Sequence, residues 1–210
     1  MTRPRHLVGV CGTATEVGKT WVGARVAAAL RSGGLSVAAR KPLQSFDRAE
    51  AGRTDAEVLA GATAEDHHDV CPPDGWYPTP MAPPMAADVL GRRCPTLAEV
   101  VRSITWPAGC DVGLVETVGG VRSPLAEDGD SRDLVRALGV DLVLLVADAG
   151  LGTIDAVRGA HDALAPQPVV TFLNRYDEGN DLHRRNRAWL TERDGFAVVH
   201  RVDEVLDLLR

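Results

Sequence analysis

The sequence has little of what marks membrane, secreted or nucleic-acid-binding proteins. No apolar run approaches the roughly 20 residues of a membrane-spanning helix, and the run near the N-terminus is shorter than the roughly 7–15 residues of a secretory signal. The four cysteines lie far apart without a Cys-x-x-Cys pair, which argues against a disulfide framework or a zinc site. Acidic residues outnumber basic ones 29 to 23, and the four tryptophans form no stacking stripe. We therefore expect a cytoplasmic protein that binds neither membranes nor nucleic acid.

What the sequence does contain is the alternation of a globular α/β protein. Its 210 residues, 45% of them hydrophobic, are enough to bury a core as one domain spanning residues 1–210. The apolar runs typical of buried parallel strands occur at residues 7–11, 36–40, 112–115, 142–147, 169–173 and 197–200. Apolar residues at helical spacing occur at residues 20–31, 55–62, 96–104, 131–138, 153–164 and 182–193. This alternation predicts a doubly wound, mainly parallel sheet with helices on both faces, and the proline-rich stretch 71–84 is expected to be a surface loop.

The strongest chemical signal directly follows the first predicted strand. From Gly12 to Thr20 the sequence reads Gly-Thr-Ala-Thr-Glu-Val-Gly-Lys-Thr, and it leads into the first predicted helix. Strand, glycine-bounded turn and helix in this order are the layout of a phosphate-binding P-loop, whose amides and helix N-terminus favour negative charge. Gly18 lets the backbone approach phosphate, Lys19 reaches the terminal phosphates, and the Thr20 hydroxyl can bind Mg²⁺. Five residues rather than four separate the two glycines, so this is a variant of the usual pattern.

Charged residues at the ends of other predicted strands are candidates for the same site, because open α/β sheets bind ligands at the carboxyl ends of their strands. Glu116 and Asp148 each follow a predicted strand, and either carboxylate could bind Mg²⁺. Asp55 begins the helix after the second strand, where it could bind the metal or act as a plain N-cap. Lys41 ends the second strand before Pro42, which favours extended geometry, so we expect its ammonium group to meet an anion in the crevice.

These motifs resemble those of one enzyme family, the dethiobiotin synthetases. The family's P-loop reads GTDTEVGKT with the same spacing, and this chain reads GTATEVGKT. A Lys-Pro pair after the second strand, Asp55 at a helix start, and a Tyr-x-x-Pro-x-x-Pro loop at residues 77–83 are similar to further family motifs. The family's Val-Glu-Gly-Ala-Gly-Gly resembles residues 115–120, and its Leu-Gly-(Thr/Cys)-Ile-Asn resembles residues 151–155. The resemblance implies a P-loop NTPase fold.

The resemblance also implies a ligase that makes dethiobiotin in biotin biosynthesis. In that reaction CO₂ adds to one amine of 7,8-diaminononanoate, ATP with Mg²⁺ phosphorylates the carbamate, and the second amine closes a cyclic urea. A homodimer with the substrate near the subunit interface is implied as well. By this resemblance Lys41 and Lys19 are catalytic, and Mg²⁺ binds Thr20, Asp55 and Glu116. The residues implied to bind the nucleotide are Thr15, Glu16, Val17, Gly18, Lys19, Thr20, Glu116 and Asn174. The residues implied to bind the substrate are Lys41, Ser45, Thr117, Gly119 and Gly120.

Several residues depart from the family pattern and keep other functions open. Ala14 stands where the family has Asp, and Thr117 and Val118 stand where it has Gly-Ala. Asp155 replaces an Asn that helps to receive the distal carboxylate of the substrate, and His200 lies where the family has Gly-x-x-Pro near the base pocket. ATP is the expected nucleotide, with CTP or another triphosphate as alternatives. A related ligase or amidase acting on another substrate remains open. So does a regulatory or partitioning ATPase, although such proteins usually carry an additional lysine near the start of the P-loop.

Overall fold

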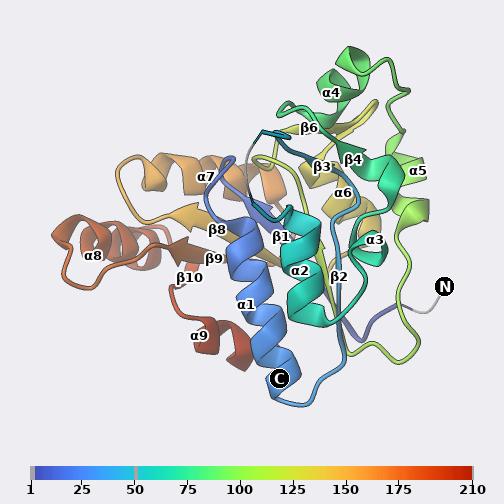
Figure 1. Ribbon diagram of the computed structural model, residues 1–210. Coiled ribbons are helices and arrows are strands. Elements are labelled where there is room, and N and C mark those ends of the chain that lie inside the picture. The colour runs from blue at the N-terminus through green and yellow to red at the C-terminus, as the bar shows by residue number, and fades with distance from the viewer. Residues whose placement is uncertain (1–2, 50–51, 210) are drawn as a thin grey trace.

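The computed structural model describes residues 3–49 and 52–209, which are built around a six-stranded parallel sheet (Figure 1). The strand order is β10-β9-β8-β1-β5-β2, and every neighbouring pair runs parallel. The strands are β1 (His6–Gly12), β2 (Val37–Arg40), β5 (Val112–Glu116), β8 (Leu142–Asp148), β9 (Val169–Asn174) and β10 (Ala197–Val199). These are the six predicted strands, so the predicted doubly wound α/β fold is confirmed.

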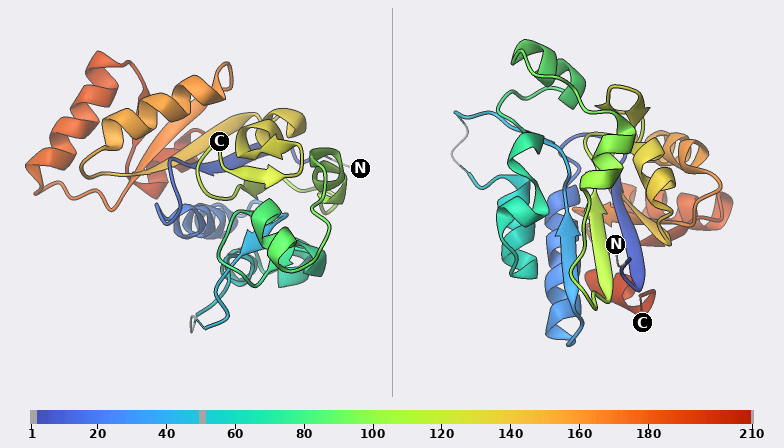
Figure 2. Two further views of the ribbon diagram at one scale, coloured as in Figure 1. Left: turned by 90° about the horizontal axis from the view of Figure 1, so that it is seen from above. Right: turned by 90° about the vertical axis from the view of Figure 1, so that its right-hand side faces the viewer.

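Helices cover both faces of this sheet (Figure 2). Helices α1, α2 and α9 pack on one face, and α5, α6 and α7 pack on the other. The helices are α1 (Lys19–Ser32), α2 (Asp55–Thr63), α3 (His67–Val70), α4 (Pro83–Val89), α5 (Leu97–Ser103), α6 (Ser131–Leu138), α7 (Thr153–Leu164), α8 (Asp181–Ala188) and α9 (Val202–Asp207). No helix in the described part of the chain has the length and apolar character needed to cross a bilayer.

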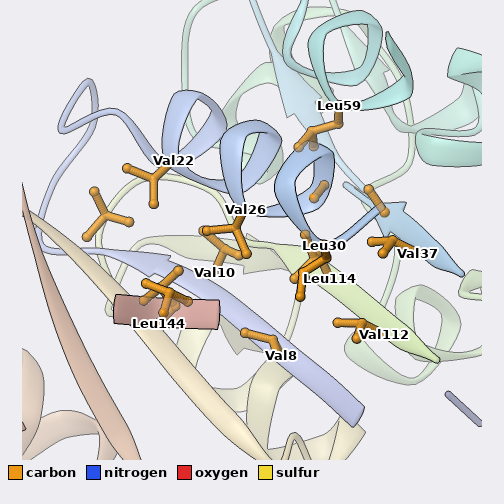
Figure 3. Packing of buried hydrophobic residues seen from close by; sticks show 14 of the residues in the cluster. Val8, Val10, Val22, Val26, Leu30, Val37, Leu59, Val112, Leu114 and Leu144 are labelled. Carbon is orange, nitrogen blue, oxygen red and sulfur yellow. The ribbon is translucent and has the colours of Figure 1, made fainter. Parts of the chain in front are cut away.

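Strand β1 shows how the sequence builds two cores. Successive side chains of a strand point to opposite faces, so Val8 and Val10 pack beneath α1 while Leu7 and Cys11 pack on the other face. The apolar side chains of α1 point onto those of β1 and β5 (Figure 3). Because both faces are covered, the strands are apolar throughout rather than alternating, which is why continuous apolar runs located them.

The expectation of a loop across residues 71–84 is wrong in part. That stretch contains a 3₁₀ turn (Pro73–Gly75) and strand β4 (Trp76–Tyr77), and α4 begins at its end. Strand β4 pairs in parallel with β3 (Gln44–Ser45), and a second small ladder joins β6 (Pro124–Ala126) antiparallel to β7 (Gly129–Asp130). The last predicted helix also divides, because α8 gives way to a π-helical turn at Trp189–Arg193.

Helix α1 begins differently from its neighbours. Helices α2, α5 and α6 each start with a capping box, in which a side chain accepts a hydrogen bond from the first turn. At the start of α1 the N-cap is Gly18, with no side-chain cap and no acidic residue in the first turn. Its N-terminal amides therefore remain available for an anionic ligand.

Candidate active site

In the loop between β1 and α1, several carbonyls accept from protein donors, and the Thr13 amide donates to the Val146 carbonyl at 3.0 Å. Among the described residues, nothing accepts a hydrogen bond from the amides of Ala14 through Gly18. The Ala14 carbonyl accepts from Lys19 Nζ at 3.0 Å, and the Glu16 carbonyl accepts from Arg175 Nη2 at 2.9 Å. A run of unpaired amides next to a helix N-terminus is an anion-binding concavity.

Asn174, at the end of β9, fixes the far side of this loop. Its Nδ2 donates to the Val17 carbonyl at 2.9 Å. Gly18 has a φ of 94°, and a Cβ there would lie 2.2 Å from Asn174 Nδ2. Only glycine tolerates both the left-handed backbone and this close approach. The structure thus places Asn174 on the loop itself, where it holds Val17 and Gly18 in place.

Lys19 lies back across the loop. Its side chain is largely buried, and its ammonium group donates a hydrogen bond to the Ala14 carbonyl. Burial, together with repulsion from the Lys41 ammonium, lowers the pKa of Lys19. An anion in the concavity would relieve both effects, so the lysine is placed to bind phosphate.

Next to the loop, side chains from three further segments converge on Thr20. The Thr20 hydroxyl lies 2.8 Å from Asp55 Oδ1 and 2.8 Å from Glu116 Oε1. The Lys41 ammonium lies 2.6 Å from Glu116 Oε1 and 2.9 Å from Asp55 Oδ2. Strand order explains the meeting, because β5 lies between β1 and β2 and the carboxyl ends of all three strands share one edge.

Two carboxylates share one ammonium group in this cluster. Burial lowers the pKa of Lys41, but attraction from Glu116 and Asp55 outweighs it and raises that pKa overall, so the lysine stays charged. Burial likewise raises the pKa of Asp55, but Lys41 outweighs it and the net shift is downward. For the buried Glu116, burial raises the pKa most; attraction from Lys41 exceeds the repulsion from Asp55, but the net shift is still upward. Glu116 therefore carries the costliest charge in the cluster.

The same oxygens suit a magnesium ion. Mg²⁺ prefers hard oxygen ligands, usually one or two carboxylates with phosphate oxygens and waters. Thr20, Asp55 and Glu116 bring such oxygens together, and Glu116 Oε2 is buried without a hydrogen-bond partner. No group of three or more His, Cys, Asp or Glu side chains gathers as a metal site within residues 3–49 and 52–209, so phosphate oxygens would have to complete the coordination. The donor set fits Mg²⁺ bound together with a nucleotide.

The predicted substrate-binding residues surround this cluster in different ways. Ser45 Oγ is buried without a partner, close in sequence to Lys41. A Cβ at Gly120 would lie 2.9 Å from the Thr13 carbonyl, so the turn after β5 packs directly on the P-loop. A Cβ at Gly119 would lie 3.7 Å from Thr15 Oγ1, so the Thr15 hydroxyl lies close to that turn. Together these contacts bring Thr15, Gly119 and Gly120 to one region, whereas Ser45 lies on β3, where it pairs with Tyr77 of β4.

Thr117 reaches the site only through its backbone. Its side chain is fully buried, and its hydroxyl donates to the Val10 carbonyl at 3.4 Å. Its own carbonyl lies 3.5 Å from Lys41 Nζ. The threonine side chain is therefore packed in the core and adds no bulk to the crevice.

Asp148, a candidate metal ligand from its position after a strand, lies apart from the Thr20 cluster. It pairs with Arg175 at 2.8 Å and accepts from the Gly150 amide at 2.9 Å. Both contacts lower its pKa, the Arg175 hydrogen bond most. Its role is therefore tied to Arg175 rather than to Thr20.

A cavity of about 410 Å³ opens beside the loop, and no sequence motif indicates most of the residues that line it. Its walls are Gly18, Trp21, Phe172, Asn174, Arg175, Tyr176 and His200. Trp21 is 49% exposed in α1, and the Arg25 guanidinium lies over its ring, 4.5 Å from the centroid. Both ring nitrogens of His200 are buried without a hydrogen-bond partner. The sequence signal available for Trp21 is its position directly after the Gly-Lys-Thr motif.

Comparison with known proteins decides between the families that share this architecture. A family described as an AAA domain matches residues 6–170. The chain is 39% identical over 165 residues to the ATP-dependent dethiobiotin synthetase BioD of Caulobacter vibrioides, covering 74% of this chain and 72% of that protein. It is 34% identical over 204 residues to the BioD of Haloferax mediterranei, covering 94% of this chain and 84% of that protein. The chain belongs to the dethiobiotin synthetase family. As a family member it is an ATP-dependent P-loop enzyme with a role in biotin biosynthesis.

Solved structures of the same fold include proteins outside the dethiobiotin synthetase family. A plasmid partition protein from Borrelia burgdorferi superimposes with a TM-score of 0.56 at 12% identity, covering 99% of this chain and 97% of that one. Identity at that level shows a common fold alone. Among the alternatives left open by the motifs, sequence similarity therefore favours the ligase over the partitioning ATPase.

Proposed function

We propose that the chain converts 7,8-diaminononanoate, CO₂ and ATP to dethiobiotin in a Mg²⁺-dependent reaction. The observation that carries the proposal is the buried Lys41 ammonium group, held 2.6 Å from Glu116 and 2.9 Å from Asp55 beside the P-loop. A partitioning-type nucleotide switch usually carries its additional lysine near the start of the P-loop, where this chain has none, and it has no need of a lysine that faces a carbamate. A second buried cation suits an enzyme that must bring an anionic carbamate to an anionic phosphoryl group.

The nucleotide would lie along the P-loop and into the neighbouring cavity. The free amides of Ala14 through Gly18 would hold the phosphates, with Lys19 on the terminal ones. The cavity opens next to Gly18 and offers the rings of Trp21 and Tyr176 to a planar base. This arrangement supports Thr15, Glu16 and Val17 as further loop contacts.

The proposed reaction has three steps. One neutral amine attacks the carbon of CO₂, an N–C bond forms, and the nitrogen loses a proton to leave a carbamate. A carbamate oxygen then attacks the γ-phosphorus of ATP, and the bond from that phosphorus to the ADP oxygen breaks. Finally the second amine attacks the carbamoyl carbon and loses a proton, and inorganic phosphate leaves as the ring closes.

The residues of this chain would orient the anions and neutralise their charge. Lys41 would hold the carbamate oxygen and stabilise the charge that develops during transfer, and Lys19 would do so on the γ-phosphoryl oxygens. Mg²⁺, held by Thr20, Asp55 and Glu116, would neutralise phosphate charge when bound. The unpartnered Ser45 hydroxyl would donate to the carbamate or the diamine, and the Gly119–Gly120 turn would line the substrate.

We also propose a single domain over residues 1–210 that acts as a homodimer with the substrate near the interface. Leu151, which is 93% exposed on the loop between β8 and α7, offers a position at which a charge probes this assembly. Burial of its side chain against a partner would favour association, and an aspartate there would oppose it. Light scattering on the wild type and on Leu151→Asp tests this: a dimer that dissociates in the variant is expected, and a wild-type monomer contradicts it.

The reaction is tested by measuring phosphate release from ATP while one substrate at a time is left out. We expect release only when the diamine, bicarbonate and Mg²⁺ are all present. Substituting CTP, GTP or UTP at equal concentration tests base preference in the same assay. Release that does not depend on the diamine would contradict the proposed substrate and favour a simple ATPase or a ligase for another amine.

A further inference from the structure

Arg175 connects three segments at the edge of the sheet where the strands end: the end of β9, the end of β8 and the loop after β1. It directly follows β9, and its backbone has a φ of 56°, which is uncommon for a residue other than glycine. Its Nη1 lies 2.8 Å from Asp148 Oδ2 at the end of β8, and its Nη2 donates to the Glu16 carbonyl in the P-loop at 2.9 Å. Asp148 is itself fixed, because its Oδ1 accepts from the Gly150 amide. The guanidinium group therefore bridges an anchored carboxylate and the loop.

Because the peptide bond is planar, this contact also fixes the direction of the next backbone amide in the P-loop. In a trans peptide the C=O and the following N–H point in opposite directions. Holding the Glu16 carbonyl on Arg175 therefore turns the Val17 amide the other way, into the concavity. Asn174 does the same for the Gly18 amide by holding the Val17 carbonyl. Glu16 needs such support, because its φ of 62° is a strained conformation for its residue type.

Arg175 is poorly placed to act as a phosphate ligand itself. One of its terminal nitrogens faces a carboxylate and the other a carbonyl, and the adjacent Asp148 charge offsets its own. We propose that Arg175 is a positioning residue that keeps the P-loop in its nucleotide-accepting conformation through the Glu16 carbonyl, with Asp148 as its anchor. This inference rests on the proposed nucleotide-binding function of the loop.

Binding of two probes separates this role from a direct contact. Calorimetry with ATP and with inorganic tripolyphosphate would be run on the wild type, Arg175→Ala, Asp148→Asn and the double variant. We expect Arg175→Ala to weaken both probes by the same factor, about 5- to 20-fold for one charge-assisted hydrogen bond. Asp148→Asn should weaken both in the same direction but less, and the double variant should be no worse than Arg175→Ala. The value of kcat at saturating ATP should change less than KM for ATP.

Arg158→Ala is the matched control. Arg158 is a half-exposed arginine that pairs with Asp194, at 2.9 and 2.6 Å, away from the loop. Its loss should leave the affinity for both probes unchanged, with a shift of the melting temperature similar to that of Arg175→Ala.

Three outcomes with the variants would overturn this inference alone. A loss of affinity in Arg175→Ala confined to ATP would make Arg175 a base contact. Tighter binding in Asp148→Asn would make it a direct phosphate contact, because removing a nearby negative charge then helps the anion. Unchanged binding in Arg175→Ala would leave it no role in the loop. A wild type that binds neither probe would instead overturn the proposed nucleotide site itself, and this inference with it.

Discussion

Replacing Lys41 with methionine removes the only ammonium group in contact with Glu116 and Asp55 among the described residues, while keeping similar side-chain volume. Removing one partner of a buried ion pair costs about 3–5 kcal/mol, because the other charge is left without compensation. Asp55 is 44% exposed and is screened by water, so its share is small. We therefore expect the free energy of unfolding at pH 7 to fall by about 2–4 kcal/mol.

The loss should depend on pH in a definite direction. Burial already raises the pKa of Glu116 above its usual 4.5, and loss of Lys41 would raise it further. A carboxyl with a raised folded-state pKa contributes stability that is present below the unfolded pKa and is lost as pH rises through the folded one. The variant should therefore recover part of the difference from wild type between pH 7 and pH 5, measured by urea unfolding.

The activity of Lys41→Met should fall much further than its stability implies. Removing one group that stabilises transition-state charge typically lowers kcat by about 10² to 10³. KM for ATP should change little, since the phosphates are held by the loop. Arg40→Met is the control, because Arg40 is an adjacent buried cation paired with Glu65 at 2.7 Å, remote from the P-loop. If Lys41→Met kept kcat within about threefold of Arg40→Met, the catalytic role of Lys41 would be refuted.

Three further predictions follow from the site. Thr20→Val should raise the Mg²⁺ concentration needed for half-maximal activity about tenfold or more, in a Mg²⁺ titration at saturating ATP; an unchanged midpoint would exclude Thr20 as a ligand. Gly18→Ala places a Cβ 2.2 Å from Asn174 Nδ2 at a φ of 94°. The free energy of unfolding should therefore fall by about 1–3 kcal/mol, and the affinity for ATP should decrease. Wild-type ATP affinity in that variant would contradict the loop geometry. Burial raises the pKa of Cys11 to about 12, so peptide mapping after iodoacetamide treatment at pH 8 should show the half-buried Cys94 modified first. Equal rates at both cysteines would contradict the described burial.

The sequence located the long elements because each carries its own signal. The six buried strands are continuous apolar runs, and α6 and α7 have the predicted bounds. Helix α4 was missed, although a proline at its first position is a known start signal. The two-residue strands β3 and β4 exist only because they pair with each other, so no local pattern could reveal them.

The site likewise has a part that the sequence predicts and a part that only the fold reveals. The P-loop is local, and its motif can be found without the fold. Lys41 and Glu116 are 75 residues apart, and only the position of β5 between β1 and β2 brings them together. Arg175 reaches the Glu16 carbonyl across 159 residues of sequence. A contact to a backbone carbonyl leaves no residue-type signature in the partner, so it was not predictable.

The most direct test of the account is the mass of the product formed from ¹³C-bicarbonate. Purified protein would be incubated with 7,8-diaminononanoate, ATP, Mg²⁺ and labelled or unlabelled bicarbonate, and the products compared by mass spectrometry. We expect the wild type to give dethiobiotin that is heavier by one mass unit with the label, and Lys41→Met to give almost no dethiobiotin. No cyclic urea from a wild type that binds ATP would contradict the proposed reaction.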